Sequence, residues 1–132
     1  MSENSCIQWN ELIEAALSVR ERAYAKYSQF RVGAALLSVT GEVFAGCNVE
    51  NASYGLTQCA ERSAVTAAVA AGHLHFAAIA LAGPGVCMPC GACRQVLAEF
   101  CEELPVLIVD ADDPTKRLET NLRELLPGRF TL

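Results

Sequence analysis

The pattern of apolar and polar positions divides the chain into short elements of changing period. Residues 11 to 25 carry apolar side chains at helical spacing, which predicts an amphipathic helix. Two short β-type runs follow at 32–39 and 43–49, on either side of Thr40-Gly41-Glu42. Because two such runs joined by a short glycine-containing turn are typical of a β-hairpin, they predict a pair of antiparallel strands.

The second half of the chain alternates helix and strand. The expected elements are an alanine-rich helix over 58–71, a buried strand over 76–82, a helix over 91–101 and a strand over 106–110. Near the end, Asn121 with Glu124 three residues later resembles a capping box that opens a short last helix. Strands that alternate with helices indicate an α/β domain, in which the hairpin supplies the antiparallel part of the sheet.

Composition indicates one domain that handles a small partner of low charge. A chain of 132 residues that is 52% hydrophobic can form one core, so a single domain over 1–132 is expected. A net charge of −5 and scattered basic residues disfavour nucleic acid as a partner. The chain shows neither a signal-peptide pattern nor a membrane-length apolar run, so no membrane partner is expected. Seven cysteines then indicate a reducing compartment, the cytoplasm.

Four of the cysteines suggest a metal site. Cys87, Cys90 and Cys93 follow one another at three-residue steps, and Cys59 opens the alanine-rich helix. Cys90 and Cys93 also open a helix, and a helix N-terminus lowers the pKa of a thiol because its N–H groups favour negative charge. Three protein ligands leave the fourth tetrahedral position open, which is typical of a catalytic zinc, and Glu61 is placed to serve there as a base.

The cysteine spacing also fits two other kinds of metal site. Adding Cys87 to the other three would close a structural four-cysteine zinc site, although no second C-x-x-C pair occurs outside 87–93. A C-x-x-C-x-x-C run can hold an iron–sulfur cluster, but the typical Cys-Pro continuation is absent. Pro89 disfavours helical backbone in the residue before it, so Cys87 is expected to point away from the turn that carries Cys90 and Cys93.

Cys-Ala-Glu followed by Pro-Cys-x-x-Cys is the signature of zinc deaminases, with cysteine in place of the more usual histidine. The sequence resembles the small cytidine deaminases that act on free nucleosides, from about Tyr24 to Phe130. The blocks that carry the resemblance are YSQFRVGAALL (27–37), GCNVENASY (46–54), CAERSA (59–64), PCGACRQV (89–96) and ELLPG (124–128). Lys26 stands where these enzymes often have proline, and Met88 where serine is usual.

The resemblance implies a three-layer fold, with a mixed sheet of about five strands flanked by helices. It implies hydrolytic deamination of cytidine and 2′-deoxycytidine to uridine and 2′-deoxyuridine, with release of ammonia, in pyrimidine salvage. One Zn²⁺ per chain would be held by Cys59, Cys90 and Cys93. Glu61 would be the catalytic residue that moves protons between water, ring and leaving amine. Arg62 is similar to an arginine that donates hydrogen bonds to the ligand sulfurs.

The resemblance also implies residues for substrate and for assembly. Asn48 and Glu50 alternate along one expected strand, so both can face one pocket. In the resembled enzymes this pair holds the ribose 3′-hydroxyl, and Phe30 packs on the pyrimidine. The other implied substrate-binding positions are Val49, Ala52, Tyr54, Ala60 and Phe130. Ala52, Tyr54 and Phe130 match positions that enter a neighbouring subunit's site, so a homotetramer is implied.

The residues leave two other functions open. A deaminase of another aminopyrimidine nucleoside, such as a nucleoside antibiotic, would keep the three ligands and Glu61 but would not need Asn48 and Glu50. A non-enzymatic metal-binding module would use four cysteines and close the site. An editor of polynucleotides is the least favoured function, because the chain is acidic.

Overall fold

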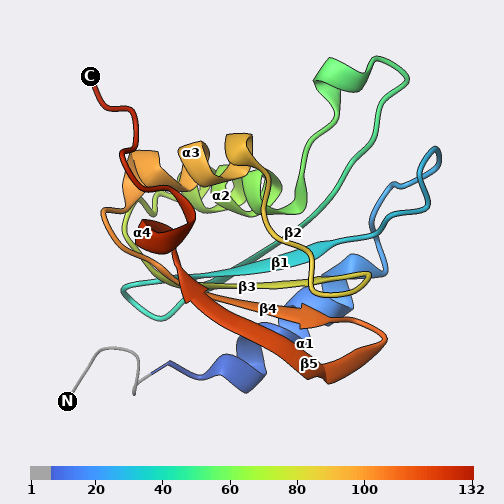
Figure 1. Ribbon diagram of the computed structural model, residues 1–132, viewed down its shortest axis with the longest axis horizontal. Coiled ribbons are helices and arrows are strands. Elements are labelled where there is room, and N and C mark those ends of the chain that lie inside the picture. The colour runs from blue at the N-terminus through green and yellow to red at the C-terminus, as the bar shows by residue number, and fades with distance from the viewer. Residues whose placement is uncertain (1–6) are drawn as a thin grey trace.

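The computed structural model describes residues 7–132, which form a five-stranded mixed sheet between layers of helices (Figure 1). The strands lie in the order β2-β1-β3-β4-β5 and are β1 (Gly33–Ser38), β2 (Val43–Cys47), β3 (Phe76–Gly83), β4 (Pro105–Asp110) and β5 (Asp113–Asn121). The helices are α1 (Trp9–Arg20), α2 (Ala60–Ala70), α3 (Gly91–Phe100) and α4 (Leu122–Leu125), with a 3₁₀ helix η2 (Tyr54–Leu56). Within this part of the chain, no helix is long and apolar enough to cross a membrane.

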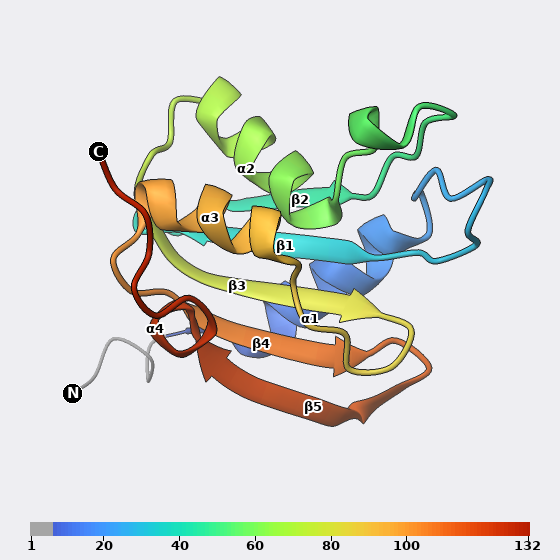
Figure 2. The same ribbon diagram turned by 45° about the horizontal axis from the view of Figure 1, so that its top comes forward.

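Side chains alternate across the sheet and build a core on each face. On one face, Leu36, Ile79 and Ile108 belong to a core that includes residues of α2, α3 and α4. On the other face, Leu107 packs in a second core with Leu12 of α1. Figure 2 shows α1 on one side of the sheet and both α2 and α3 on the other. The three-layer fold expected from the sequence is therefore confirmed.

The hairpin, the crossover and the last helix form as predicted. β1 and β2 pair antiparallel, with Leu37 opposite Val43, and Gly41 takes φ of 96° in the turn between them. β3 and β4 are parallel, and α3 connects them. At α4, the side chain of Asn121 accepts a hydrogen bond from the backbone N–H of Glu124 at 2.9 Å. This bond satisfies an N–H group that has no partner within the first turn of the helix, so Asn121 caps α4 as the capping box predicted. The second bond of a capping box does not form, because the carboxylate of Glu124 accepts from the hydroxyl of Thr120 at 3.0 Å instead.

The first helix ends at Arg20, whereas the pattern predicted helix as far as residue 25. Tyr24 leaves the helix to pair with a distant segment instead. Its N–H donates to the carbonyl of Asn48 at 2.9 Å, and its carbonyl accepts from the N–H of Glu50 at 2.8 Å. A residue inside a helix uses its N–H and carbonyl groups within that helix, so Tyr24 cannot be helical and also make these two bonds. The chain that follows α1 is thereby fixed beside two of the predicted substrate-binding residues.

The strand β5 was not predicted. It pairs antiparallel with β4 at one edge of the sheet, and its residues from Thr115 to Glu119 are exposed. An edge strand with one open side needs no continuous apolar run. The segment therefore lacked the hydrophobic signal that identified the central strands.

Gly46 allows α2 to approach β2 closely. A Cβ atom at Gly46 would lie 2.3 Å from the backbone nitrogen of Ala64 and 2.7 Å from the carbonyl oxygen of Ala60. Both atoms belong to the helix backbone, which cannot move aside as a flexible side chain can. Only glycine permits this approach. The helix whose N-terminus carries Cys59 and Glu61 is thus held against the sheet at this point.

Candidate metal centre and adjoining pocket

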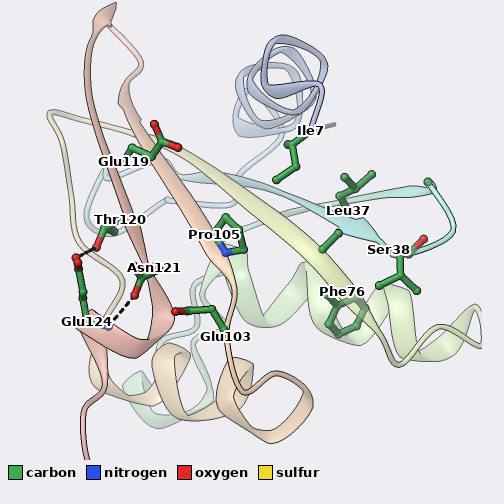
Figure 3. Close-up of a pocket in the computed structure, with 13 residues that line it drawn as sticks. Ile7, Leu37, Ser38, Phe76, Glu103, Pro105, Glu119, Thr120, Asn121 and Glu124 are labelled. Atoms are coloured by element: carbon green, nitrogen blue, oxygen red, sulfur yellow. Dashed lines mark hydrogen bonds between the residues drawn. The ribbon is translucent and has the colours of Figure 1, made fainter. Parts of the chain in front are cut away.

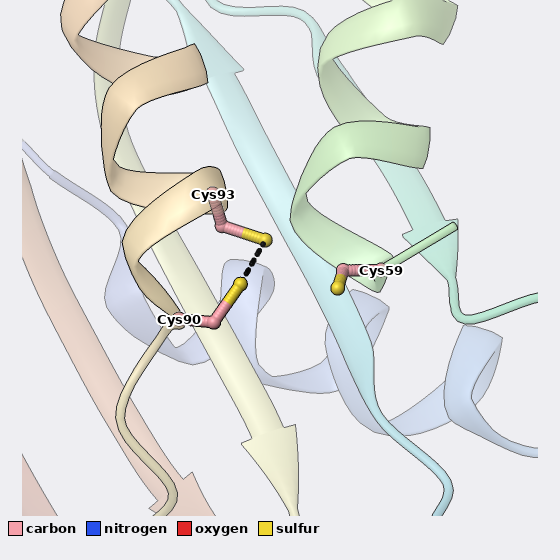
Figure 4. A group of neighbouring side chains, drawn as sticks. All are labelled: Cys59, Cys90 and Cys93. Atoms are coloured by element: carbon pink, nitrogen blue, oxygen red, sulfur yellow. Dashed lines mark hydrogen bonds between the residues drawn. The ribbon is translucent and has the colours of Figure 1, made fainter. Parts of the chain in front are cut away.

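Three cysteine side chains meet where the N-termini of α2 and α3 come together (Figure 4). The Sγ atoms of Cys59, Cys90 and Cys93 all lie within 4.8 Å of one another, and those of Cys90 and Cys93 are 3.4 Å apart. Cys59 and Cys90 are the N-cap residues of α2 and α3, yet neither side chain makes a capping hydrogen bond to the backbone of its helix. Their sulfurs are therefore available to a common ligand.

The surroundings of the cluster favour negative charge on sulfur. Hydrogen bonding from Cys93, with a further contribution from Arg62, outweighs burial and lowers the pKa of Cys59 to about 5. The Nη2 of Arg62 donates to the Sγ of Cys59 at 3.1 Å. The bond to Cys59 and burial in turn raise the pKa of Cys93 strongly, because two thiols this close resist ionising together. A cation between the sulfurs would remove that conflict.

The cluster fits a tetrahedral zinc ion. Zinc–sulfur bonds of about 2.3 Å place two ligand sulfurs about 3.8 Å apart, which lies within the spread of separations in the cluster. Thiolates are ligands that zinc accepts readily. Three protein ligands leave one coordination position for a small molecule, as in catalytic rather than structural zinc sites.

Cys87 lies outside this three-sulfur group, as predicted. Its Sγ packs against Gly83 at the end of β3. A Cβ atom added at Gly83 would lie only 2.7 Å from this sulfur. Burial, together with the charge of Glu61, raises the pKa of Cys87, so its thiol stays neutral. Cys87 nevertheless lines the cavity beside the cluster, a position that the sequence did not reveal.

Glu61 is a buried carboxyl within this cavity. It belongs to the first turn of α2, and only 6% of the residue is exposed. Burial raises the pKa of Glu61, because a charged carboxylate loses its hydration inside the protein. A carboxyl of this kind, two residues after a metal ligand, can accept and return a proton.

The cavity has a volume of about 300 Å³, at the lower end of the range for small-molecule sites. It brings together seven of the residues predicted from the sequence, which are Phe30, Asn48, Glu50, Cys59, Ala60, Glu61 and Cys90. Cys93 belongs to the cluster without lining the cavity, and Arg62 contacts the cluster through its hydrogen bond to Cys59. The substrate-binding and metal-binding predictions therefore converge on one place, although they come from separate parts of the chain.

Asn48 follows β2 instead of lying within it, and its side chain holds the chain around Phe30. Its Oδ1 accepts from the N–H of Val32 at 2.8 Å, and its Nδ2 donates to the carbonyl of Phe30 at 2.8 Å. Asn48 is only 8% exposed. An amide has two donor protons and two acceptor lone pairs, so one of each remains for a substrate.

Glu50 also lies beyond β2, and its carboxylate is bound by the loop that follows α1. The backbone N–H groups of Tyr27 and Ser28 donate to its Oε1 at 2.9 and 3.1 Å. The hydroxyl of Ser28 donates to its Oε2. These bonds, the one from the Ser28 hydroxyl foremost, lower the pKa of Glu50 and keep it ionised.

Four of the predicted substrate-binding residues do not line this cavity: Val49, Ala52, Tyr54 and Phe130. The backbone of Val49 pairs with Tyr24 and Gln58, and its side chain is exposed. Tyr54 is 81% exposed and lines an adjoining cavity of about 330 Å³ that shares Glu50 with the first. Phe130 is 69% exposed. In a single chain these side chains do not contribute to the pocket that holds Glu61.

Sequence reasoning missed Arg94 and Ser28. The Nε of Arg94 donates to the carbonyl of Pro89 and its Nη1 donates to the carbonyl of Leu125, both at 2.7 Å. These bonds tie the turn before Cys90 to α4. The position of Arg94 within the PCGACRQV block was the only available signal, since helical spacing presents it as an ordinary surface cation.

A larger cavity, of about 660 Å³, lies at the opposite end of the strands (Figure 3). Phe76 and Pro105, at the starts of β3 and β4, line it together with Glu103 and Glu124. Neither the three clustered cysteines nor Glu61 reach it. The reactive groups therefore select the smaller cavity as the site.

Three thiols arranged for zinc, with a buried carboxyl beside them in a small cavity, define the class of catalytic zinc sites that activate water. The model of the cytidine and deoxycytidylate deaminase zinc-binding region matches residues 7–108. A cytidine deaminase from Sporosarcina psychrophila is 45% identical over 124 residues, which cover 92% of this chain and 90% of that protein.

Solved structures and more distant relatives agree. The crystal structure of a cytidine deaminase from Burkholderia pseudomallei matches with a TM-score of 0.88 and 50% identity, covering 94% of this chain and 100% of that one. A blasticidin-S deaminase from Bacillus cereus is 30% identical over 131 residues, 92% of this chain and 91% of that protein. The chain belongs to the cytidine and deoxycytidylate deaminase family, and it is a zinc-dependent enzyme of that family.

Proposed function

We propose that the protein hydrolyses cytidine and 2′-deoxycytidine to uridine and 2′-deoxyuridine, with release of ammonia, in pyrimidine salvage. The observation that carries the proposal is the cavity that Glu61 lines together with Cys59 and Cys90 of the cluster and with the polar pair Asn48 and Glu50. The names of relatives at 45% and 50% identity support this substrate. A single catalytic domain over 1–132 and a cytoplasmic location, both indicated by composition, remain predictions.

In this proposal Cys59, Cys90 and Cys93 hold the ion, and zinc, when bound, supplies a Lewis acid that makes water acidic. Glu61 accepts a proton from the attacking water and delivers it to N3 of the pyrimidine ring. The water oxygen bonds to C4, and Glu61 then carries the second proton of that oxygen to the exocyclic amine. The C4–N bond breaks, the oxygen becomes the C4 carbonyl and the amine leaves as ammonia. Burial raises the pKa of Glu61, which suits a group that must hold a proton between these steps.

The surrounding residues support this chemistry in two ways. Arg62 donates to the Sγ of Cys59 and offsets part of the negative charge that three thiolates bring to the metal. Phe30 and Ala60 line the cavity and offer apolar surface to the ring, while Asn48 and Glu50 bind sugar hydroxyls. A carboxylate at that end repels phosphate, so a free nucleoside is favoured over a nucleotide.

Metal content and activity together test the proposed function. Purified protein is expected to contain one zinc ion per chain and to reduce the ultraviolet absorbance of cytidine as uridine forms. Removal of zinc with a chelator is expected to stop the reaction, and added zinc to restore it. Fully zinc-loaded protein without turnover of cytidine or 2′-deoxycytidine would overturn the proposal.

Glu50→Gln is expected to lower kcat/KM for cytidine roughly ten- to a hundredfold, because a neutral amide replaces a charge-assisted acceptor. For 1-methylcytosine, which carries the same base without a sugar, kcat/KM is expected to fall much less. Steady-state kinetics on both compounds measure the difference. Equal losses of kcat/KM for the two compounds would mean that Glu50 does not recognise the sugar.

A nucleoside antibiotic is the second candidate substrate, supported by the similarity to a blasticidin-S deaminase. Such an enzyme would keep the three cysteines and Glu61 but would not need the sugar contacts of Asn48 and Glu50. The ratio of kcat/KM for cytidine to that for blasticidin S decides between the two. A ratio below one would favour the antibiotic.

We also propose a homotetramer in which Ala52, Tyr54 and Phe130 enter the site of a neighbouring subunit. The support is the exposure of the two aromatic side chains, 81% for Tyr54 and 69% for Phe130, which leaves both free to contact a neighbouring subunit. Light scattering is expected to give about four times the chain mass of 14.1 kDa. A fully active monomer would contradict this assembly.

A further inference from the structure

We propose that Ser28 is a positioning residue that aims the carboxylate of Glu50 at a sugar hydroxyl of the substrate. The inference rests on the proposed function of Glu50. Ser28 lines the cavity, and its hydroxyl stands between two other residues of the wall. The Oγ donates a hydrogen bond to the Oε2 of Glu50 and accepts one from the backbone N–H of Phe30 at 2.9 Å.

The acceptor positions of Glu50 are nearly all used by this loop. A carboxylate oxygen offers about two lone pairs. Oε1 already accepts from the N–H groups of Tyr27 and Ser28, at 2.9 and 3.1 Å. Among the described residues, Oε2 accepts only from the hydroxyl of Ser28. One acceptor position therefore remains on Glu50, and its direction is set by the bond that Ser28 makes to the same oxygen.

The hydroxyl of Ser28 has no donor left for a substrate. Its single proton goes to Glu50, and one of its lone pairs receives the N–H of Phe30. Ser28 thus acts through its neighbours and not as a donor to the substrate. It connects the residue proposed to bind the sugar with the residue proposed to pack on the base.

The backbone of the loop holds Ser28 in this place. Gln29 has φ of 62°, in the left-handed region that few side chains adopt, and its N–H donates to the carbonyl of Ala25 at 2.9 Å. This turn reverses the chain directly after Ser28 and brings the N–H of Phe30 back to the Ser28 hydroxyl. A strained backbone kept beside a binding site is consistent with a positioning function.

Ser28→Ala tests the inference through the preference for a sugar. The variant is expected to lower kcat/KM for cytidine about tenfold, chiefly through KM, which corresponds to the loss of one hydrogen bond. The same parameter for 1-methylcytosine is expected to change less than about twofold, and zinc content is expected to stay at one per chain. Ser28→Thr keeps the hydroxyl and is expected to restore the preference for cytidine.

A double-mutant cycle with Glu50→Gln separates the possible failures. If Ser28 acts through Glu50, adding Ser28→Ala to Glu50→Gln is expected to lower kcat/KM for cytidine by less than a further factor of about two. A full tenfold further loss, or equal losses for both compounds in Ser28→Ala alone, would overturn the inference and leave the function of Glu50 standing. If Glu50→Gln itself leaves the preference for cytidine unchanged, the sugar-binding function and the inference fail together.

Discussion

Glu61→Gln is expected to retain one zinc ion per chain and to lose at least ~10²-fold in cytidine turnover. The substitution preserves the shape of the side chain, so the cavity and the cysteine cluster stay intact. Among the described residues, Glu61 and Glu50 are the two carboxyls that line the cavity, and Glu50 is the one proposed to bind the sugar, so the substitution removes the carboxyl proposed to carry protons. Because Glu61 is only 6% exposed, bulk water cannot readily carry the proton in its place. Metal analysis and steady-state kinetics measure the two quantities.

Glu99→Gln provides the matched control for this experiment. Glu99 is an exposed carboxylate on α3, so its loss changes net charge by the same amount away from the cavity. The turnover of cytidine by Glu99→Gln is expected to match that of the unaltered protein. Near-normal turnover in Glu61→Gln would show that another group carries the protons, and the proposed mechanism would then be wrong.

Cys90→Ala and Cys93→Ala are each expected to empty the zinc site and to abolish deamination. Two remaining thiols cannot complete a tight site with one open position, and an enzyme without its metal loses the group that activates water. The loss of activity is expected to exceed ~10²-fold in either variant. Circular dichroism checks that the fold survives, which matters most for Cys93 because it is fully buried.

Cys87→Ser is the matched control among the cysteines. Cys87 lies outside the three-sulfur group and stays a neutral thiol, so the variant is expected to keep one zinc per chain and most of its activity. Loss of the metal in Cys87→Ser would mean that four cysteines close the site. A closed site has no position for water, and the deaminase mechanism would be excluded.

The central part of the fold could be predicted because burial leaves a plain pattern. β3 and β4 are covered by helices on both faces, so their sequences are almost continuously apolar. The edge strand β5 lacks that pattern because most of its residues face solvent. The end of α1 was misplaced because the bonds of Tyr24 to residues 48 and 50 depend on tertiary structure, which local periodicity does not reveal.

The candidate site likewise has features that local sequence predicts and features that depend on tertiary structure. Cys90 and Cys93 stand one helical turn apart, so their shared direction follows from local geometry, whereas bringing Cys59 to them requires the whole sheet. The resemblance to a known family supplied that link. The bonds from Ser28 to Glu50 and from Arg94 to Leu125 span 22 and 31 residues, and nothing in either segment alone indicates its partner.

The polarity of β5 also bears on how copies of the chain can associate. An edge strand presents unpaired backbone groups that invite a further strand from another molecule. Lys116, Arg117 and Glu119 lie exposed along this edge, and a docking strand would have to strip water from their charges. Open-ended polymerisation through sheet extension is therefore opposed at β5. In the homotetramer proposed above, copies would instead meet through exposed side chains such as Tyr54 and Phe130, and an assembly of four subunits is closed.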